Sequence, residues 1–301
     1  MQRYLRYLAA GLTLSASLLV CQPAYAATIP GQQLNVPQGT ASLNWAGYVA
    51  QNSGTYTSVT GTWTIPAVPA NPSGAADATW VGIGGVQTHD LIQAGTQALI
   101  NSNGTVTYTA WVETLPGYSQ TVSLAVASGD SITATLSQVS QDVWSVVIKD
   151  NTSGQSYSAT LNYDSSLSSA EWVEEMVSNQ NGAFISLDSF GMVGFTGASA
   201  TVNGTSENLA ELNAQPLPMV NSAGSILASV SALGSDGASF SVTRTSASPS
   251  ASVPRGTVGR WHVIQTATST PGADPGFTFV RRLRAQTDGR HIGFSFVLMR
   301  F

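Results

Sequence analysis

The chain carries short runs in which apolar and polar residues alternate, and turn sequences separate these runs. In the clearest run, from Val106 to Glu113, the even-numbered residues are apolar or tyrosine and the odd-numbered ones are polar or tryptophan. A period of two over eight residues predicts a β-strand with one face in a core. Trp111 and Glu113 therefore share the face that points away from that core.

Further segments have the same strand character, and Asn/Gly-rich or Asp/Gly turn sequences lie between many of them. They are residues 58–65, 121–127, 131–138, 143–149, 156–163, 183–190, 198–202, 225–231 and 238–243. Many short strands without alternating helices predict an all-β fold, an antiparallel β-sandwich of two packed sheets.

One segment departs from the strand pattern. In residues 168–178, Ser168 followed by Glu171 resembles a helix capping box. We predict one or two helical turns there, with Glu171, Glu174 and Glu175 in solvent.

Residues 1–26 predict a secretory signal peptide. They combine a basic start, an apolar stretch over residues 7–20 and a small-residue cleavage site over residues 24–26. The apolar stretch is too short for a membrane-spanning helix, so we expect a secreted, extracellular protein without stable membrane insertion. The one cysteine, Cys21, would leave with the signal. Anchoring through Cys21 as a lipoprotein is the alternative, which the bulky Val20 disfavours.

The remainder divides by composition. Residues 27–43 form a short lead or propeptide, and residues 44–244 form the sandwich domain. Residues 245–256 are rich in Ser, Ala and Pro and predict a linker. Residues 257–301 are an Arg-rich C-terminal extension of unknown role.

Charged residues are scarce, at 9% of the chain against roughly 25% in an average soluble protein. Residues 27–243 hold 14 acidic residues and one basic residue, Lys149, whereas residues 244–301 hold eight arginines and two acidic residues. In acid the carboxylates become neutral and self-repulsion almost disappears, which suits an acidic medium. The alternative is that a Ser/Thr-rich secreted β protein is simply poor in charge.

The charge balance bears on partners as well. A net charge of −5 gives no indication of nucleic-acid binding. The Arg-rich extension suggests a latch that pairs with the acidic domain at neutral pH and releases as its carboxylates protonate.

The inventory of side chains excludes several mechanisms. Without Cys21 there is no thiol nucleophile, and His89 is the only histidine before residue 262. No Gly-x-Ser-x-Gly elbow and no His-Glu-x-x-His motif is present, so we expect neither a serine triad nor a metal or other cofactor. Carboxylates and amides remain. A partly dry glutamate can take a proton from water and return it, and a glutamine can donate to an oxyanion.

Six short blocks follow one another along the chain, and together they resemble the secreted glutamic peptidases, the eqolisins, over roughly residues 44 to 243. The blocks are Asn44-Trp45-Ala46-Gly47-Tyr48, Gly61-Thr62-Trp63-Thr64-Ile65-Pro66, Trp80-Val81-Gly82-Ile83-Gly84-Gly85, Leu91-Ile92-Gln93-Ala94-Gly95, Ala110-Trp111-Val112-Glu113 and Ala170-Glu171-Trp172-Val173-Glu174-Glu175.

The resemblance implies a lectin-like (concanavalin A-like) sandwich of two sheets, with a cleft that holds a Gln/Glu catalytic pair. By motif, Gln93 corresponds to the family's catalytic glutamine and Glu175 to its catalytic glutamate. Trp80 corresponds to the tryptophan that lines the site, and Glu113 to a carboxylate of the cleft. Trp45 is a further candidate for substrate binding.

The match leaves alternatives open. Gly84 and Thr109 stand where the family carries acidic residues, so substrate preference and part of the hydrogen-bond network are expected to differ. Glu174 beside Glu175 leaves the base ambiguous by one position, and we prefer Glu175.

The candidate residues also have purely structural interpretations. Trp45 and Trp80 could be ordinary core residues, Gln93 a solvated strand residue, and Glu113 a partner of a loop.

We therefore expect a secreted acid endopeptidase, a monomer that acts on protein or peptide substrates. In this hypothesis Glu175 activates a water molecule, Gln93 stabilises the oxyanion, and Glu175 then protonates the leaving amine. One alternative is a glycoside hydrolase that uses Glu113 and Glu175. Another is a non-catalytic sandwich that binds carbohydrate or peptide.

Overall fold

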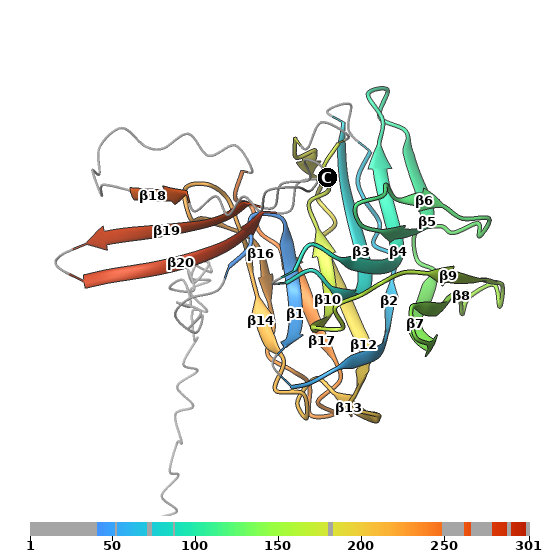
Figure 1. The fold of residues 1–301 in the computed structure, drawn as a ribbon. Helices are drawn as coiled ribbons and strands as arrows, with labels where there is room; N and C mark the ends of the chain where they lie inside the picture. The colour runs from blue at the N-terminus through green and yellow to red at the C-terminus, as the bar shows by residue number, and fades with distance from the viewer. Residues whose placement is uncertain are drawn as a thin grey trace, which may run out of the picture. The chain divides into compact units, whose positions relative to one another are not determined.

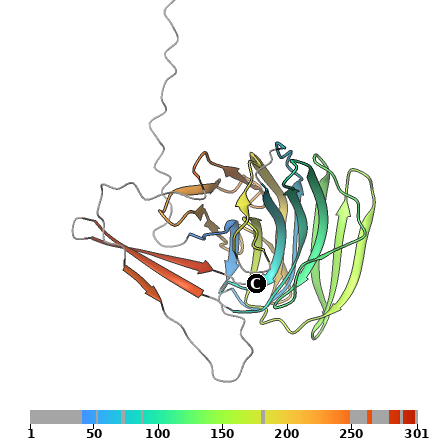
Figure 2. The same cartoon turned by 90° about the horizontal axis from the view of Figure 1, so that it is seen from above.

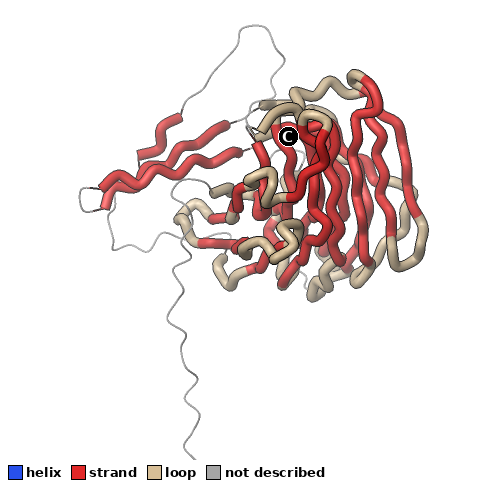
Figure 3. The backbone as a smooth tube through the Cα atoms, turned by 90° about the horizontal axis from the view of Figure 1, so that it is seen from below, coloured by secondary structure: helices blue, strands red, loops and turns tan. Residues whose placement is uncertain are grey.

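The computed structural model describes residues 41–51, 53–70, 74–86, 88–179 and 183–248, and the backbone of three further strands. Strands and loops make up this described part, which contains no helix (Figures 1 and 3). Accordingly, no helix long and apolar enough to cross a membrane is found in it. The predicted signal peptide and residues 27–40 of the predicted lead lie outside the described residues.

The first sheet has eight strands and carries the candidate residues. From one edge to the other it consists of β14 (Gln215–Leu217), β1 (Trp45–Gln51), β10 (Ser169–Glu175), β3 (Ala75–Gly84), β4 (Leu91–Ile100), β5 (Val106–Thr114) and β6 (Gln120–Thr121). The eighth strand, β11 (Ser186–Leu187), pairs with β3 in parallel, and the other pairs are antiparallel.

The second sheet has nine strands. Eight of them follow the order β15 (Met219–Val220), β16 (Ile226–Val230), β17 (Phe240–Arg244), β12 (Met192–Val202), β2 (Tyr56–Thr64), β7 (Ser131–Ser140), β8 (Val143–Asp150) and β9 (Ser156–Asn162); β13 (Thr205–Asn208) pairs with β12. Figure 2 shows the two sheets stacked as layers. The predicted antiparallel β-sandwich is confirmed.

The C-terminal extension contains a separate three-stranded antiparallel sheet, β18 (His262–Gln265), β19 (Phe279–Thr287) and β20 (Arg290–Leu298). The proposed pairing of its arginines with the acidic domain stays a prediction. The predicted linker begins as part of the sandwich, because the amide of Thr245 donates to the carbonyl of Leu227 and Asn221 Nδ2 donates to the carbonyl of Ser248.

Tryptophans tie the two sheets together through their indole nitrogens. Trp172 on β10 donates to the carbonyl of Thr60 on β2 at 2.7 Å, and Trp63 on β2 donates to Thr96 Oγ1 on β4 at 2.9 Å. Both rings are fully buried in the apolar layer between the sheets. A buried indole needs a partner for its N–H, so these two bonds favour one relative position of the sheets.

The predicted helical turns at residues 168–178 are wrong, because Ser169–Glu175 form the buried strand β10. This strand pairs with β1 on one side and β3 on the other. Two ladders of backbone hydrogen bonds and burial of Trp172 and Val173 outweigh a local capping signal worth about 1 kcal/mol. The glutamates of this segment are consequently buried and not solvated.

Two predicted strands are largely wrong as well. Only the start of 121–127 pairs, as β6 at the sheet edge, and only Ser186–Leu187 within 183–190 form a strand, β11. Each has one strand neighbour in the sheet, β5 and β3 respectively, so pairing ends where the chain leaves that neighbour.

A glycine on β4 makes room for the tryptophan beside it. Gly95 pairs with Trp80 on β3 and with Trp111 on β5. A Cβ at Gly95 would lie 2.2 Å from the carbonyl oxygen of Thr79 and 2.5 Å from Cβ of Trp80. The close contact of β3 and β4 at this point therefore depends on the missing side chain.

We predict that Gly95→Ala lowers the free energy of unfolding by about 1–3 kcal/mol, because the methyl group must push β3 and β4 apart. Gly194→Ala on β12 is the matched control, since a Cβ there meets nothing within 4 Å. Urea unfolding of both variants checks the prediction. Equal stability of Gly95→Ala and Gly194→Ala would contradict it.

Candidate active site

The alternation of β10 separates its glutamates. Trp172 points into the layer between the sheets, so Glu174 points the same way, whereas Glu171, Val173 and Glu175 share the opposite face. We call this opposite face of the first sheet the cleft face. Of the two adjacent glutamates, only Glu175 lies on this face together with Trp80.

Both carboxyl oxygens of Glu175 are held by nitrogen donors. Trp80 Nε1 donates to Glu175 Oε2 at 2.8 Å, and Asn44 Nδ2 donates to Glu175 Oε1 at 3.0 Å. Trp80 comes from the neighbouring strand β3, and Asn44 directly precedes β1. The carboxyl group is thus fixed at both oxygens by neutral donors.

Gln93 and Glu113 form a second pair on the cleft face. They are direct neighbours in the ladder between β4 and β5, and Gln93 Nε2 donates to Glu113 Oε2 at 2.5 Å. Gln93 is 1% exposed, so it is not a solvated strand residue. As predicted from the alternation of β5, Glu113 and Trp111 lie on the cleft face while Ala110 and Val112 lie in the core.

Burial raises the pKa of both site carboxyls. The pKa of Glu175 rises to about 8, because burial and then the charge of nearby Glu113 disfavour ionisation, while the bonds from Trp80 and Asn44 oppose the rise. Burial also raises the pKa of Glu113 to about 7, against the opposing hydrogen bond from Gln93. Both groups therefore carry protons in acid.

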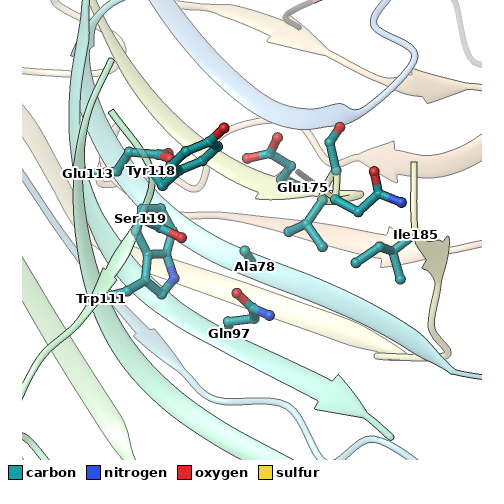
Figure 4. Close-up of a pocket in the computed structure, with 11 residues that line it drawn as sticks. Ala78, Gln97, Trp111, Glu113, Tyr118, Ser119, Glu175 and Ile185 are labelled. Atoms are coloured by element: carbon teal, nitrogen blue, oxygen red, sulfur yellow. The ribbon is translucent and has the colours of Figure 1, made fainter. Parts of the chain in front are cut away.

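A cavity of about 330 Å³ opens over these groups. Figure 4 shows Glu113 and Glu175 at this cavity with Trp111, Tyr118 and Gln97. Tyr118 is 60% exposed and stands beside it on the β5–β6 loop. The cavity has room for a substrate side chain or a short piece of extended peptide.

In the structure, the predicted catalytic pair, Gln93 and Glu175, is linked through a third residue, Glu113. Gln93 pairs with Gly82 on β3 and Glu175 pairs with Ala78, so the two residues lie on opposite sides of β3 and are offset along it by four residues, roughly 13 Å. Glu113 connects the two, since it accepts the bond from Gln93 and lines the same cavity as Glu175. Gln93 itself is not among the residues that line this cavity, and Glu113, its neighbour on β5, lies one strand farther from β10.

The glutamine at the cavity wall is Gln97, which the sequence reasoning missed. It pairs with Ala78, the residue that also pairs with Glu175. The period of two along β4 places Gln93, Gly95 and Gln97 on one face, and this signal could have revealed it.

The predicted aromatic residues also meet on this face. Trp45 packs edge-on against Trp80, with ring centroids 4.9 Å apart. Both belong to an apolar cluster on the cleft face that includes Trp111 and Val173. Trp45 pairs with Glu175 in the β1–β10 ladder. These rings shield one side of the Glu175 carboxyl from water.

Comparison with known proteins identifies the family of this chain. Residues 43–243 match the Peptidase A4 family. The chain belongs to this family, the eqolisins. The resemblance drawn from the six sequence blocks is thereby confirmed, and the family region spans the sandwich.

Individual relatives point the same way. Aspergillopepsin-2 of Aspergillus niger is 31% identical over 188 residues, which cover 54% of this chain and 66% of that protein. Scytalidopepsin B of Scytalidium lignicola is 32% identical over 193 residues, covering 60% of this chain and 72% of the relative. A crystal structure of scytalido-glutamic peptidase with a transition state analog inhibitor has a TM-score of 0.58 and 26% identity, covering 68% of this chain and 100% of that one.

A second group of acids, which we call the buried acid cluster, consists of Asp77 and Glu174 on the reverse face of β3 and β10 and of Asp188 directly after β11. All three are at most 2% exposed, and Asp77 interacts with both of the others. Arg244 lies near Asp188, but its hydrogen bonds go to backbone carbonyls, including that of Asp188. Within the described ranges, no group of three or more His, Cys, Asp or Glu is arranged to hold a metal ion.

Burial disfavours the ionised form of each of these carboxyls and so favours protonation of the cluster. Burial raises the pKa of Asp77 to about 6 and that of Asp188 to about 8, and it raises the pKa of Glu174 as well, with the charge of Asp77 adding to the effect. A raised folded-state pKa gives stability that is fully present below the unfolded pKa near 4 and is lost as the pH rises through the folded value.

We predict that the sandwich loses stability between pH 4 and pH 8, as the pH rises through the raised pKa values of the buried acid cluster. Glu174→Gln should flatten this loss, because the amide cannot ionise. Urea unfolding at each pH measures it, with Glu207→Gln on β13 as the control. An unchanged pH dependence in Glu174→Gln would show that the cluster does not govern it.

Proposed function

We propose that this chain is a secreted acid endopeptidase that hydrolyses peptide bonds with Glu175 and Gln93. The observation that carries the proposal is the Glu175 carboxyl, held at both oxygens at the wall of a cavity, in a chain of the Peptidase A4 family. The inhibitor complex of scytalido-glutamic peptidase supports a peptide as the substrate. Secretion rests on the signal pattern of residues 1–26.

In acid the reaction starts from a protonated Glu175. One oxygen of this carboxyl accepts a proton from the attacking water as the water oxygen bonds to the scissile carbonyl carbon. The other oxygen gives its proton to the carbonyl oxygen, so Glu175 ends the step with one proton, as it began. The amide of Gln93 donates a hydrogen bond to that carbonyl oxygen while negative charge develops on it.

Collapse of the tetrahedral intermediate uses the same carboxyl. Glu175 gives its proton to the leaving nitrogen as the C–N bond breaks, and it takes back the proton of the intermediate's hydroxyl group. The products are a carboxylic acid and an amine, and the enzyme is restored. For Gln93 to reach the carbonyl oxygen, its amide must turn from Glu113, to which it donates in this structure, toward the cavity that Glu175 lines.

We predict that Glu175→Gln lowers kcat by about 10³-fold or more, because the amide can neither accept nor return a proton. Glu174→Gln, one residue away on the opposite face, should retain kcat in acid. Hydrolysis of a quenched peptide at pH 3 to 4 measures both. Activity in Glu175→Gln, or its loss only in Glu174→Gln, would contradict the assignment.

The same assay compares the glutamines. Gln93→Ala should lower kcat by about 10²–10³-fold, the usual effect of removing one oxyanion donor. Gln97→Ala should act mainly on KM, since Gln97 lies at the cavity wall. The reverse pattern would assign the oxyanion role to Gln97.

We predict that kcat/KM is highest in acid and falls as the pH rises through about 7 to 8. Because the pKa values of Glu113 and Glu175 are raised, the protonated forms dominate below this window and disappear above it. Initial rates from pH 2 to 9 test this, with circular dichroism at each pH to confirm that the fold persists. A tenfold rise in rate per pH unit between pH 3 and pH 6 would identify the carboxylate as the active form.

A further inference from the structure

The segment before β1 contacts Glu175 in a way that the two catalytic roles do not use. Asn44 is 1% exposed, and its Nδ2 donates to Glu175 Oε1 at 3.0 Å. Its backbone carbonyl also accepts from the amide of Met176 at 2.8 Å, directly after Glu175. Asn44 thus binds the end of β10 through both its side chain and its backbone.

The orientation of the Asn44 amide is set by Ser42. Ser42 Oγ donates to Asn44 Oδ1 at 3.1 Å, and the same oxygen accepts from the backbone amides of Asn44 at 3.2 Å and Trp45 at 3.0 Å. One hydroxyl proton and two lone pairs are then all in use. Because Oδ1 is bound to the hydroxyl, Nδ2 is the side of the amide that faces Glu175.

Ser42 is in turn fixed by the backbone between β14 and β16. Its amide donates to the carbonyl of Pro218 at 3.0 Å, and its carbonyl accepts from the amide of Val220 at 2.8 Å. Pro218 lies between β14 of the first sheet and β15 of the second. These two bonds therefore fix Ser42 relative to the segment that connects the two sheets.

We propose that Ser42 and Asn44 are positioning residues that orient the Glu175 carboxyl toward the cavity and keep it there during the reaction. This inference rests on the proposed function of Glu175. It also concerns maturation, because Ser42 lies within the lead that the sequence assigned to residues 27–43. A processing cut that leaves a fully active enzyme must then fall before Ser42.

The pair also affects protonation. A hydrogen bond donated to a carboxyl oxygen favours the ionised form, so the Asn44 bond lowers the pKa of Glu175 against the larger effect of burial. Glu113 is the charged group that raises it, and Trp80 donates to the other oxygen. Loss of the Asn44 bond should move the alkaline fall in activity to higher pH.

The test uses the full chain with Asn44→Ala, Ser42→Ala and Ser42→Thr. We expect Asn44→Ala to lower kcat by about 10- to 100-fold, because it removes a hydrogen bond to an ionisable group. The alkaline limb of the pH–rate profile should also shift to higher pH. Ser42→Ala should do the same to a smaller extent. Ser42→Thr keeps the hydroxyl and should restore the wild-type profile.

Asn221→Ala is the matched control, because Asn221 is also a buried asparagine held by loop hydrogen bonds, to Ala223, Ser225 and Ser248. It should lower stability without moving the pH–rate profile. Thermal melts confirm that each variant is folded at the assay temperature, and Ser42→Ala carries the test if Asn44→Ala does not fold.

Two results would overturn the inference, and each differs from failure of the proposed function. Wild-type kcat and pH profile in Asn44→Ala, with Glu175→Gln inactive, would remove the positioning role and leave the catalytic role intact. A profile shift of the same size in Asn221→Ala would make the effect one of general stability. Activity in Glu175→Gln would instead contradict the proposed function itself.

Discussion

Burial of carboxyl groups without cationic partners is the constraint on which the rest of this structure depends. Glu175 is bound by an indole and an amide, and Glu113 by an amide, so neutral donors supply the hydrogen bonds that these acids receive. Such groups stay buried at low cost only while they hold protons. Lys and Arg are scarce in the sandwich, so neutral donors are the partners of these carboxyls and burial raises their pKa values.

This constraint also links stability to function through the strand β10. Its alternation sends Glu175 to the cleft face and Glu174 to the layer between the sheets, where it joins the buried acid cluster. Ionisation of Glu174 between the sheets therefore destabilises β10, the strand that positions the Glu175 carboxyl on the cleft face. A protein built in this way keeps its fold and its candidate site in the same protonation range.

The sequence predicted strands with one half-exposed face better than strands that are buried on both faces. The run from Val106 to Glu113 has one face in the core and one toward the cleft, so its alternation is visible and its strand was found. The strands β1, β3 and β10 are buried on both faces and show no alternation, so periodicity could not reveal them. For β10 a local capping signal even indicated a helix.

The candidate site was likewise predicted only in part. Motif order located Gln93, Glu175, Trp80 and Glu113, and the structure places all of them on the cleft face. Motifs could not show that Gln93 donates to Glu113, or that Glu113 lines the cavity with Glu175, because both depend on strand register. The most direct test of the account is a carbon-13 NMR titration of the glutamate carboxyls, with Glu175 assigned by its absence in Glu175→Gln. We expect the Glu175 signal to stay in its protonated position below pH 6 and to titrate near pH 8. Titration near the ordinary glutamate value, about 4.3, would contradict the account.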